Sequence, residues 1–270
     1  MDVTAAMVKS LRDKTGLSMG DCKKALVEAG GDENKAVDVL RKMGLGRIEK
    51  AADREAGQGR VVCHVEGNRA GIAEVRCESA PVSNTDDFIA LSQAVAKAAA
   101  SLDNPTPESV LAATVGGRKV SDQLHEVFNR LREKIVIQKV ACLKGEVGSY
   151  THHNGQVGVV IELNGACPNE IKADVCMQIA AMRPRVTRRE EVPADEIARE
   201  KAASLEEIKG KPPQIAEKIV TGKLERWFSE FVLLEQPFVK DDKHSVGAML
   251  NNVSKGLTVN RFVRYQVGVA

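Results

Sequence analysis

The chain has 270 residues, a formal net charge of +2, and 43% hydrophobic against 28% charged residues. This length can form one to three compact units with their own cores, and the composition is ordinary for a globular protein. Balanced charge and an aromatic content of 3% argue against a nucleic-acid binder. No apolar run approaches the ~18–20 residues that span a bilayer, and the start of the sequence lacks a secretory signal pattern. We therefore expect a cytoplasmic protein with no membrane partner.

Motifs for covalent or cofactor chemistry are missing from the sequence. There is no G-x-x-x-x-G-K-[ST] run, no H-E-x-x-H and no G-x-S-x-G elbow. The pair His152-His153 is predicted to lie on a strand, where adjacent side chains point to opposite faces and chelate a metal poorly. We predict no metal, no cofactor and no enzyme activity. The cysteines form no C-x-x-C pair and are predicted to be reduced and mostly buried: Cys22, Cys63, Cys77, Cys142, Cys167 and Cys176.

The first part of the chain has the apolar spacing of three short helices. Ser18 and Asp32 are placed to cap the second and third helices, and Gly44 is predicted to end the third. Charged residues interleaved with alanines follow. We predict a small three-helix module over residues 1–45 and a partly helical linker over residues 46–59.

Alternating apolar residues indicate that strands begin at Arg60. Gly67-Asn68 is a turn signal, Ile72–Cys77 is predicted to be the return strand, and Thr85 can cap the helix that follows. We predict a first α+β subdomain over residues 60–140, with antiparallel strands.

The same order of elements recurs later in the sequence. Asn154-Gly155 is a strong hairpin signal, Val157–Leu163 is the predicted return strand, and Asn169 can cap the next helix. Charged helical patterns joined by a Gly-Pro turn predict an antiparallel helical hairpin at about 187–228. We predict a second, related α+β subdomain over residues 141–270 that carries this hairpin, so the fold class is α+β.

Several motifs share their order and spacing with one known family. They are L-R-D-K-T-G from Leu11, M-G-D-C-K-K-A-L from Met19, G-S-Y-T-H from Gly148, R-E-E-V-P from Arg189, and L-L-E-Q-P-F-V from Leu233. Together they closely resemble the elongation factor Ts family over nearly the whole chain.

The resemblance implies a fold and a function. The expected fold is a ubiquitin-associated-like (UBA-like) helical module at the N-terminus, two related α+β subdomains and a projecting antiparallel helical hairpin. Members of this family catalyse no covalent chemistry. They are guanine-nucleotide exchange factors that bind elongation factor Tu, in its GDP-bound and nucleotide-free forms, and promote GDP release. Elongation factor Tu is therefore the expected partner.

One key motif departs from the family pattern. Where the family has C-x-T-D-F-V, this chain places Ser79, Ala80, Pro81 and Val82 after Cys77-Glu78. The resemblance implies that this segment contacts the GTPase near its magnesium site. Ala80 cannot supply a carboxylate, and Pro81 is a smaller wedge than phenylalanine. Gln178 is a second departure, because the family often has histidine there.

The family pattern also singles out residues of the N-terminal module as partner contacts. They are Met19, an apolar residue expected in an exposed loop, and Lys23 and Lys24 at the start of the second helix. Their alternative roles are structural: Met19 can pack into the core of the three helices, and the lysines can be ordinary solvated side chains.

Three other functions compete with nucleotide exchange. The altered motif at Ser79–Val82 favours a protein that only binds elongation factor Tu, or chaperones it, without accelerating exchange. A thiol-dependent enzyme would use Cys77 beside Glu78, but no accompanying base pattern supports it. A nucleic-acid binder is disfavoured by the charge balance.

Overall fold

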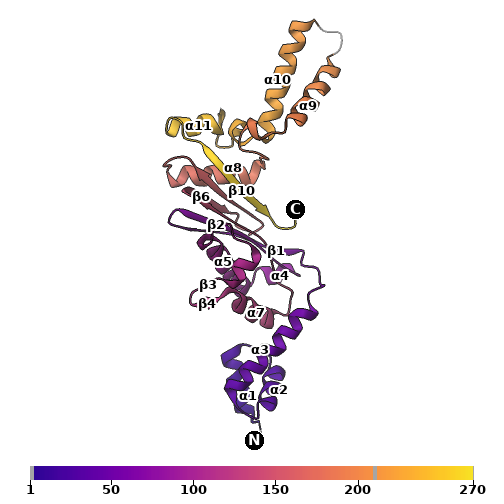
Figure 1. Cartoon of the computed structure of the whole chain (residues 1–270), viewed down its shortest axis with the longest axis vertical. Coiled ribbons are helices and arrows are strands. Elements are labelled where there is room, and N and C mark those ends of the chain that lie inside the picture. Colours follow the sequence, from indigo (N-terminus) through magenta and orange to yellow (C-terminus); the bar gives the residue numbers. More distant parts are fainter. Residues whose placement is uncertain (1–2, 209–211, 270) are drawn as a thin grey trace. The chain divides into compact units, whose positions relative to one another are not determined.

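The computed structural model describes residues 3–208 and 212–269, and it is a mixture of helices and antiparallel strands (Figure 1). The helices are α1 (Ala5–Thr15), α2 (Met19–Glu28), α3 (Glu33–Lys50), α4 (Ala80–Ser83), α5 (Asp86–Ser101), α6 (Pro107–Ala112), α7 (Val120–Leu131), α8 (Asn169–Met182), α9 (Ala194–Glu207), α10 (Pro213–Phe231) and α11 (Val246–Val253). The strands are β1 (Gln58–Glu66), β2 (Arg69–Cys77), β3 (Thr114–Val115), β4 (Arg118–Lys119), β5 (Val136–Lys144), β6 (Glu146–Thr151), β7 (Val157–Leu163), β8 (Pro237–Phe238), β9 (Asp241–Ser245) and β10 (Val259–Gln266). The α+β class predicted from the sequence is confirmed.

The chain divides into two compact units. Unit 1 comprises Met1–Val62, Ala73–Ala141 and Gln266–Ala270, and unit 2 comprises Cys63–Ile72 and Cys142–Tyr265. Strands β1 and β2 are each shared between the two groups of residues, so the chain passes from one unit to the other several times.

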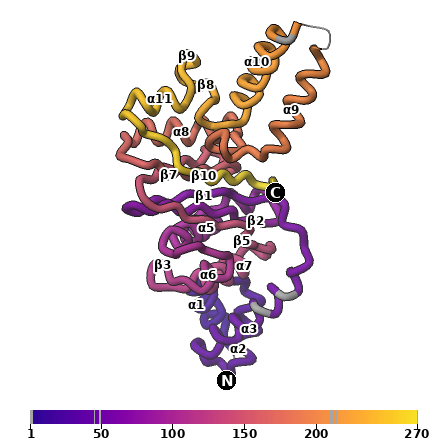
Figure 2. The backbone as a smooth tube through the Cα atoms, turned by 45° about the horizontal axis from the view of Figure 1, so that its top comes forward, coloured from indigo at the N-terminus to yellow at the C-terminus, as the bar shows by residue number. Residues whose placement is uncertain are grey.

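The N-terminal part of unit 1 consists of α1, α2 and α3, which lie together in both the ribbon and the tube view (Figures 1 and 2). The Ser18 hydroxyl accepts the Asp21 amide hydrogen bond at 3.2 Å, and Asp32 accepts that of Lys35 at 3.1 Å, so both predicted caps are confirmed. These helices enclose a core of their own, formed by Val8, Leu11, Cys22, Ala25, Leu26, Ala36 and Leu40. The predicted helical region at the N-terminus is confirmed, whereas its likeness to UBA domains stays a prediction.

The predicted helix end at Gly44 is wrong, because α3 continues through Gly44 to Lys50. A Cβ atom at Gly44 would lie 2.3 Å from Nδ2 and 2.9 Å from Cγ of Asn129, on helix α7. The glycine therefore allows a close approach between α3 and α7, a role that a local sequence pattern cannot distinguish from helix termination.

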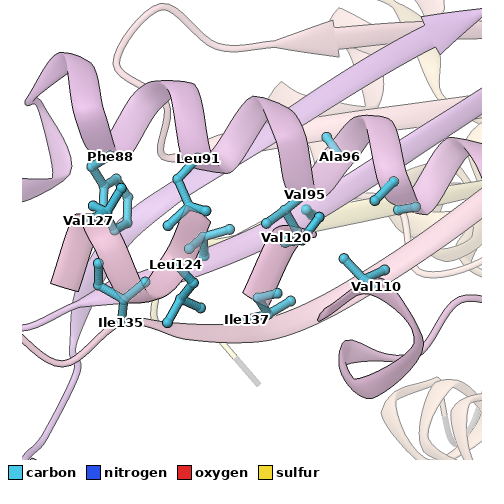
Figure 3. Close-up of a cluster of buried hydrophobic side chains, with 14 of the residues drawn as sticks. Phe88, Leu91, Val95, Ala96, Val110, Val120, Leu124, Val127, Ile135 and Ile137 are labelled. Carbon is cyan, nitrogen blue, oxygen red and sulfur yellow. The ribbon is translucent and has the colours of Figure 1, made fainter. Parts of the chain in front are cut away.

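The rest of unit 1 is built around the sheet with strand order β1-β2-β5. Side chains of α5 and α7 point toward one another in its core: Phe88, Leu91 and Val95 on α5 face Val120, Leu124 and Val127 on α7 (Figure 3). The Thr85 hydroxyl accepts the Phe88 amide hydrogen bond at 3.3 Å and starts α5 as predicted. Toward the C-terminal end of the sequence, Gly268 donates its amide to the buried Glu74 carboxylate at 3.4 Å.

Unit 2 contains the sheet with order β10-β7-β6, in which β6 and β7 pair antiparallel from Glu146↔Leu163 to Thr151↔Gly158. Helix α8 packs against this sheet, and the shared core includes Val159, Ile161, Val175 and Ile179. Asn169 was predicted to cap α8, but it is the first helical residue and Pro168 occupies the cap position. A proline before the first turn fits there because its fixed φ suits the entry to a helix.

Helices α9 and α10 lie side by side (Figure 2) and pack against one another. An ion pair joins Lys223 to Glu207. At their base, Arg189 forms ion pairs with Glu225 and Glu235 and lies 4.5 Å above the Phe228 ring. Of the predicted connecting turn, Gly210 and Lys211 lie outside the described residues. That the two helices form a projecting hairpin stays a prediction.

Candidate partner-binding site

The altered motif forms a single turn of helix rather than an open loop. Ser79 is the cap residue of α4, Pro81 lies in its first turn, and α4 bridges the end of β2 and the start of α5. Ala80 and Pro81 are exposed, whereas Val82 is half-buried against the core of unit 1. The turn therefore presents a methyl group and a prolyl ring to solvent while its remaining apolar side chain anchors it.

Hydrogen bonds hold this turn at its amino end. Glu133 accepts from the Ser79 amide at 2.9 Å and from the Ser79 hydroxyl at 2.5 Å. A carboxylate at this position also interacts favourably with the partial positive charge of the free amides at the start of the helical turn. Glu133 lies 54 residues from Ser79, so no local sequence pattern predicts this contact.

The carboxyl end of the turn is held as well. The guanidinium of Arg60 donates to the Ser83 carbonyl at 3.3 Å and to the Asn84 side chain at 2.9 Å. Asn84 in turn donates to the Ala80 carbonyl at 2.9 Å. These hydrogen bonds fix both ends of α4 and so restrict its conformational freedom.

The neighbouring carboxylate of Glu78 is engaged in hydrogen bonds within the protein. It accepts from the Lys134 amide at 2.6 Å and from the Arg54 guanidinium at 3.2 Å. These two interactions, the Lys134 hydrogen bond first, lower the pKa of Glu78. Glu78 therefore does not replace the carboxylate that the motif lacks at Ala80.

The thiol of Cys77 is poorly suited to nucleophilic chemistry. Burial, together with the charges of Glu133 and Glu78, raises the pKa of Cys77 to about 11. The thiol donates to the Ser79 carbonyl at 3.2 Å, so it serves as a buried hydrogen-bond donor. Because the thiolate is the reactive form, this environment argues against the thiol-enzyme alternative.

The candidate contacts of the N-terminal module lie on α2. Met19 is the first residue of the helix rather than part of a loop, and it is 45% exposed. Lys23 and Lys24 are exposed and form no ion pair with any residue in the described ranges. Met19 therefore does not pack into the core of the module, and these three side chains are available to a partner.

Asp21, two residues after Met19, is a buried carboxylate whose distant partners no local sequence pattern predicts. Arg47 of α3 binds it at 2.6 Å, Arg132 at the end of α7 forms a second ion pair with it, and Ser18 donates to it at 2.8 Å. The hydrogen bond from Arg47 is the main reason that the pKa of Asp21 is lowered to about 2. Asp21 thus ties α2 to both α3 and α7.

Gln178, the second departure from the family pattern, is fully buried in unit 2. Its amide donates to the Pro237 carbonyl at 3.1 Å and to the Gln236 side chain at 3.2 Å, and its oxygen accepts from the Val239 amide at 2.9 Å. The side chain therefore joins α8 to the segment around β8 and is not itself a surface contact.

Two negative findings concern the part of the chain that the structure describes. It contains no group of three or more His, Cys, Asp or Glu side chains able to hold a metal ion. None of its helices combines the length and the apolar character needed to cross a membrane.

Comparison with known proteins identifies relatives along nearly the whole chain. Residues 81–269 match the family model described as Elongation factor TS. A protein named elongation factor Ts from Lactiplantibacillus plantarum is 40% identical over 98% of this chain and 92% of its own length. Proteins of the same name from Prosthecochloris aestuarii and Methylococcus capsulatus are each 39% identical, over 98% and 99% of this chain and 99% and 93% of their own lengths. The chain belongs to the elongation factor Ts family of translation elongation factors.

Proposed function

We propose that the protein is a guanine-nucleotide exchange factor that binds elongation factor Tu in its GDP-bound form and promotes GDP release. The family membership supports this function, and its relatives carry the name of the exchange factor. It would act by binding rather than by covalent catalysis, with no cofactor of its own.

Exchange of this kind is a coupling between two ligands of the GTPase. If the protein binds nucleotide-free elongation factor Tu more tightly than the GDP-bound form, it must weaken GDP binding by the same factor. Equal affinity for the two forms would shift nothing. The protein therefore needs a surface that fits the nucleotide-free form better.

The observation that carries the proposal is the presentation of α4. Its exposed residues Ala80 and Pro81 occupy the family's contact position, on a turn fixed at both ends by Glu133 and Arg60. A second foothold consists of Met19, Lys23 and Lys24 on α2, within the N-terminal module proposed for residues 1–45. A fixed turn can act as a wedge without a charge, because its shape is already set before binding.

A binding-only role is the second candidate, and one observation favours it. The segment Ser79–Val82 contains no carboxylate, and both Glu78 before it and Glu133, which binds Ser79, are engaged in internal hydrogen bonds. The contact of Ala80 and Pro81 with the GTPase would therefore rest on apolar surface.

Stopped-flow measurement of GDP release separates the two functions. Elongation factor Tu from the same organism, loaded with a fluorescent GDP analogue, is mixed with a range of concentrations of this protein and excess unlabelled GDP. Under the exchange proposal, the release rate rises with concentration and saturates. A complex detected by calorimetry without faster release supports the binding-only role, and no complex at all contradicts both.

A further inference from the structure

We propose that Arg132, Glu133 and Lys134, here called the 132–134 corner, are positioning residues that fix the two partner contacts of unit 1 relative to one another. The contacts are the Met19–Lys24 surface of α2 and the Ser79–Val82 turn. This inference rests on the proposed function, in which both surfaces bind the same GTPase.

Consecutive residues of the corner hold the two contacts. Arg132 forms its ion pair with Asp21, which lies between Met19 and Lys23 on α2. Glu133 accepts both the amide and the hydroxyl of Ser79. Asp21 lies 111 positions from Arg132, and Ser79 lies 54 positions from Glu133. Two adjacent residues of the chain thus bind both contacts.

The backbone conformation of the corner allows Arg132 and Glu133 to bind different elements. Arg132 ends α7 in the left-handed conformation, with φ 63° and ψ 15°, and its amide donates to the Phe128 carbonyl at 2.7 Å. A non-glycine residue adopts this conformation at a cost, which the interactions of the surrounding structure must offset. The sharp change of direction sends successive side chains to different parts of the unit.

Lys134 is the third residue of the corner, and Arg54 binds the corner from the segment after α3. The Lys134 amide donates to Glu78, and its side chain donates to the Arg54 carbonyl at 2.8 Å. Arg54 donates to the Arg132 carbonyl at 3.3 Å. The segment after α3 is therefore bound to Arg132 and Lys134 of the corner, which restricts the movement of one contact relative to the other.

The Glu133–Ser79 and Arg132–Asp21 interactions are expected to affect different stages of exchange. Glu133 sets the shape of the turn that acts near the nucleotide, so its loss lowers the maximal rate of GDP release. Arg132 sets the placement of the surface that adds affinity, so its loss raises the concentration needed for half-maximal release. A general loss of stability would change both quantities and lower the melting temperature.

Two pairs of variants test the proposal in the full-length protein. Arg132→Gly removes the ion pair but suits the left-handed backbone, and Arg132→Lys restores a positive charge. Glu133→Ala removes both acceptors, and Glu133→Gln restores one acceptor and the shape. Glu126→Ala is the control, because this α7 carboxylate is exposed and pairs only with Arg118 among the described residues.

We expect Arg132→Gly to raise the half-saturating concentration by about five- to tenfold with an unchanged maximal rate, the size of one lost partly buried ion pair. Glu133→Ala should lower the maximal rate by about tenfold, as expected for lost preorganisation, with little change in half-saturation. The lysine and glutamine variants should recover most of each loss, and Glu126→Ala should behave like the parent protein.

Amide hydrogen exchange of the free protein supplies a readout that does not need the GTPase. Glu133→Ala should speed exchange at Ser79 and in α4, and Arg132→Gly should speed it in α2, with exchange in unit 2 unchanged. If the parent protein stimulates GDP release but the variants match it in both assays, the corner has no positioning role. If the parent protein does not stimulate release, the proposed function fails. Hydrogen exchange then tests the corner independently, and unchanged exchange in both variants would contradict its positioning role.

Discussion

At the residue scale, helix α3 contains two glycines with different surroundings. A Cβ at Gly44 would meet the Asn129 side chain at 2.3 Å, whereas a Cβ at Gly46 would meet nothing within 4 Å. Asn129 is 91% buried, so its amide has little room to move. The same substitution at the two positions therefore separates helix propensity from packing.

We expect Gly46→Ala to stabilise the protein by up to about 1 kcal/mol, because alanine favours the helix. Gly44→Ala gains the same propensity but forces α3 away from α7. Its free energy of unfolding should fall below that of Gly46→Ala by about 1–3 kcal/mol, the usual cost of overpacking. Urea denaturation of both variants provides the measurement, and equal stabilities would show that α3 and α7 do not approach as closely as described.

Asp21 makes the stability of the protein depend on pH. Its pKa is about 2 in the folded protein against 3.8 for an ordinary aspartate, so the folded state favours the charged form by about 2 kcal/mol. This stabilisation is fully present above about pH 4 and is lost as the pH falls through the folded pKa, toward pH 2.

The variant Asp21→Asn should therefore be less stable than the parent protein by about 2 kcal/mol at pH 7, and the difference should shrink between pH 4 and pH 2. Denaturation of both proteins across this range, in a stabilising osmolyte, is the measurement. Asp122→Asn is the control, because Asp122 pairs with Arg41 at a more exposed position and should contribute about 0–1 kcal/mol. A difference for Asp21→Asn that does not vary with pH would contradict the charge-based account.

At the element scale, the strand and helix patterns predicted most of the elements within a few residues. The predicted strand Val157–Leu163 is β7, and the helix predicted to follow Thr85 is α5. The errors at Gly44 and Asn169 have a common physical cause. A glycine or a capping residue is a local signal, and its meaning depends on a distant neighbour or on the residue before it.

For the candidate site, the sequence predicts the position of the contact residues but not the residues that hold them in place. The resemblance to the family located Ser79–Val82 and the α2 surface, but local patterns gave neither the helical turn of α4 nor the residues that hold it. Glu133 and Arg132 have no sequence signature, because their partners lie 54 and 111 residues away. Only the folded chain brings them together.

The exposed proline of α4 leads to a test at the level of this element. If Pro81 fits a matching pocket on its own GTPase, Pro81→Phe should slow GDP release, because the larger ring clashes there. The apolar area that distinguishes the two rings corresponds to about 1–2 kcal/mol, so a change of roughly tenfold is expected. Stopped-flow release with the GTPase of the same organism is the measurement.

Pro107→Phe is the matched control for this variant, because Pro107 also lies in the first turn of a short helix, α6, and is outside the proposed contacts. It should leave release unchanged. Faster release by Ala80→Asp with Pro81→Phe would show instead that the altered motif is a weakened form of the family's own. If GDP release is unchanged by Pro81→Gly, by Pro81→Phe and by Ala80→Asp with Pro81→Phe, α4 is not a contact.

At the scale of the whole molecule, the cysteines are free thiols in the described structure. Burial is the main reason that the pKa values of Cys63 and Cys77 are raised to about 11. We expect GDP release and the melting temperature to be the same with and without dithiothreitol. We also expect both thiols to react with iodoacetamide at pH 8 far more slowly in the native protein than in urea. A loss of activity on reduction would reveal a required disulfide.

The interleaving of the two units has a consequence for synthesis on the ribosome. Gly268 and Val269 hydrogen-bond to Glu74 and Lys139 of unit 1, yet the residues from Cys142 to Tyr265 belong to unit 2. At ~5–20 residues per second, roughly 6–25 s separate the emergence of Ala141 from that of Gln266. During that interval the fully buried Glu74 lacks its backbone partner. Unit 1, although it begins first, is therefore completed only after unit 2 has been made.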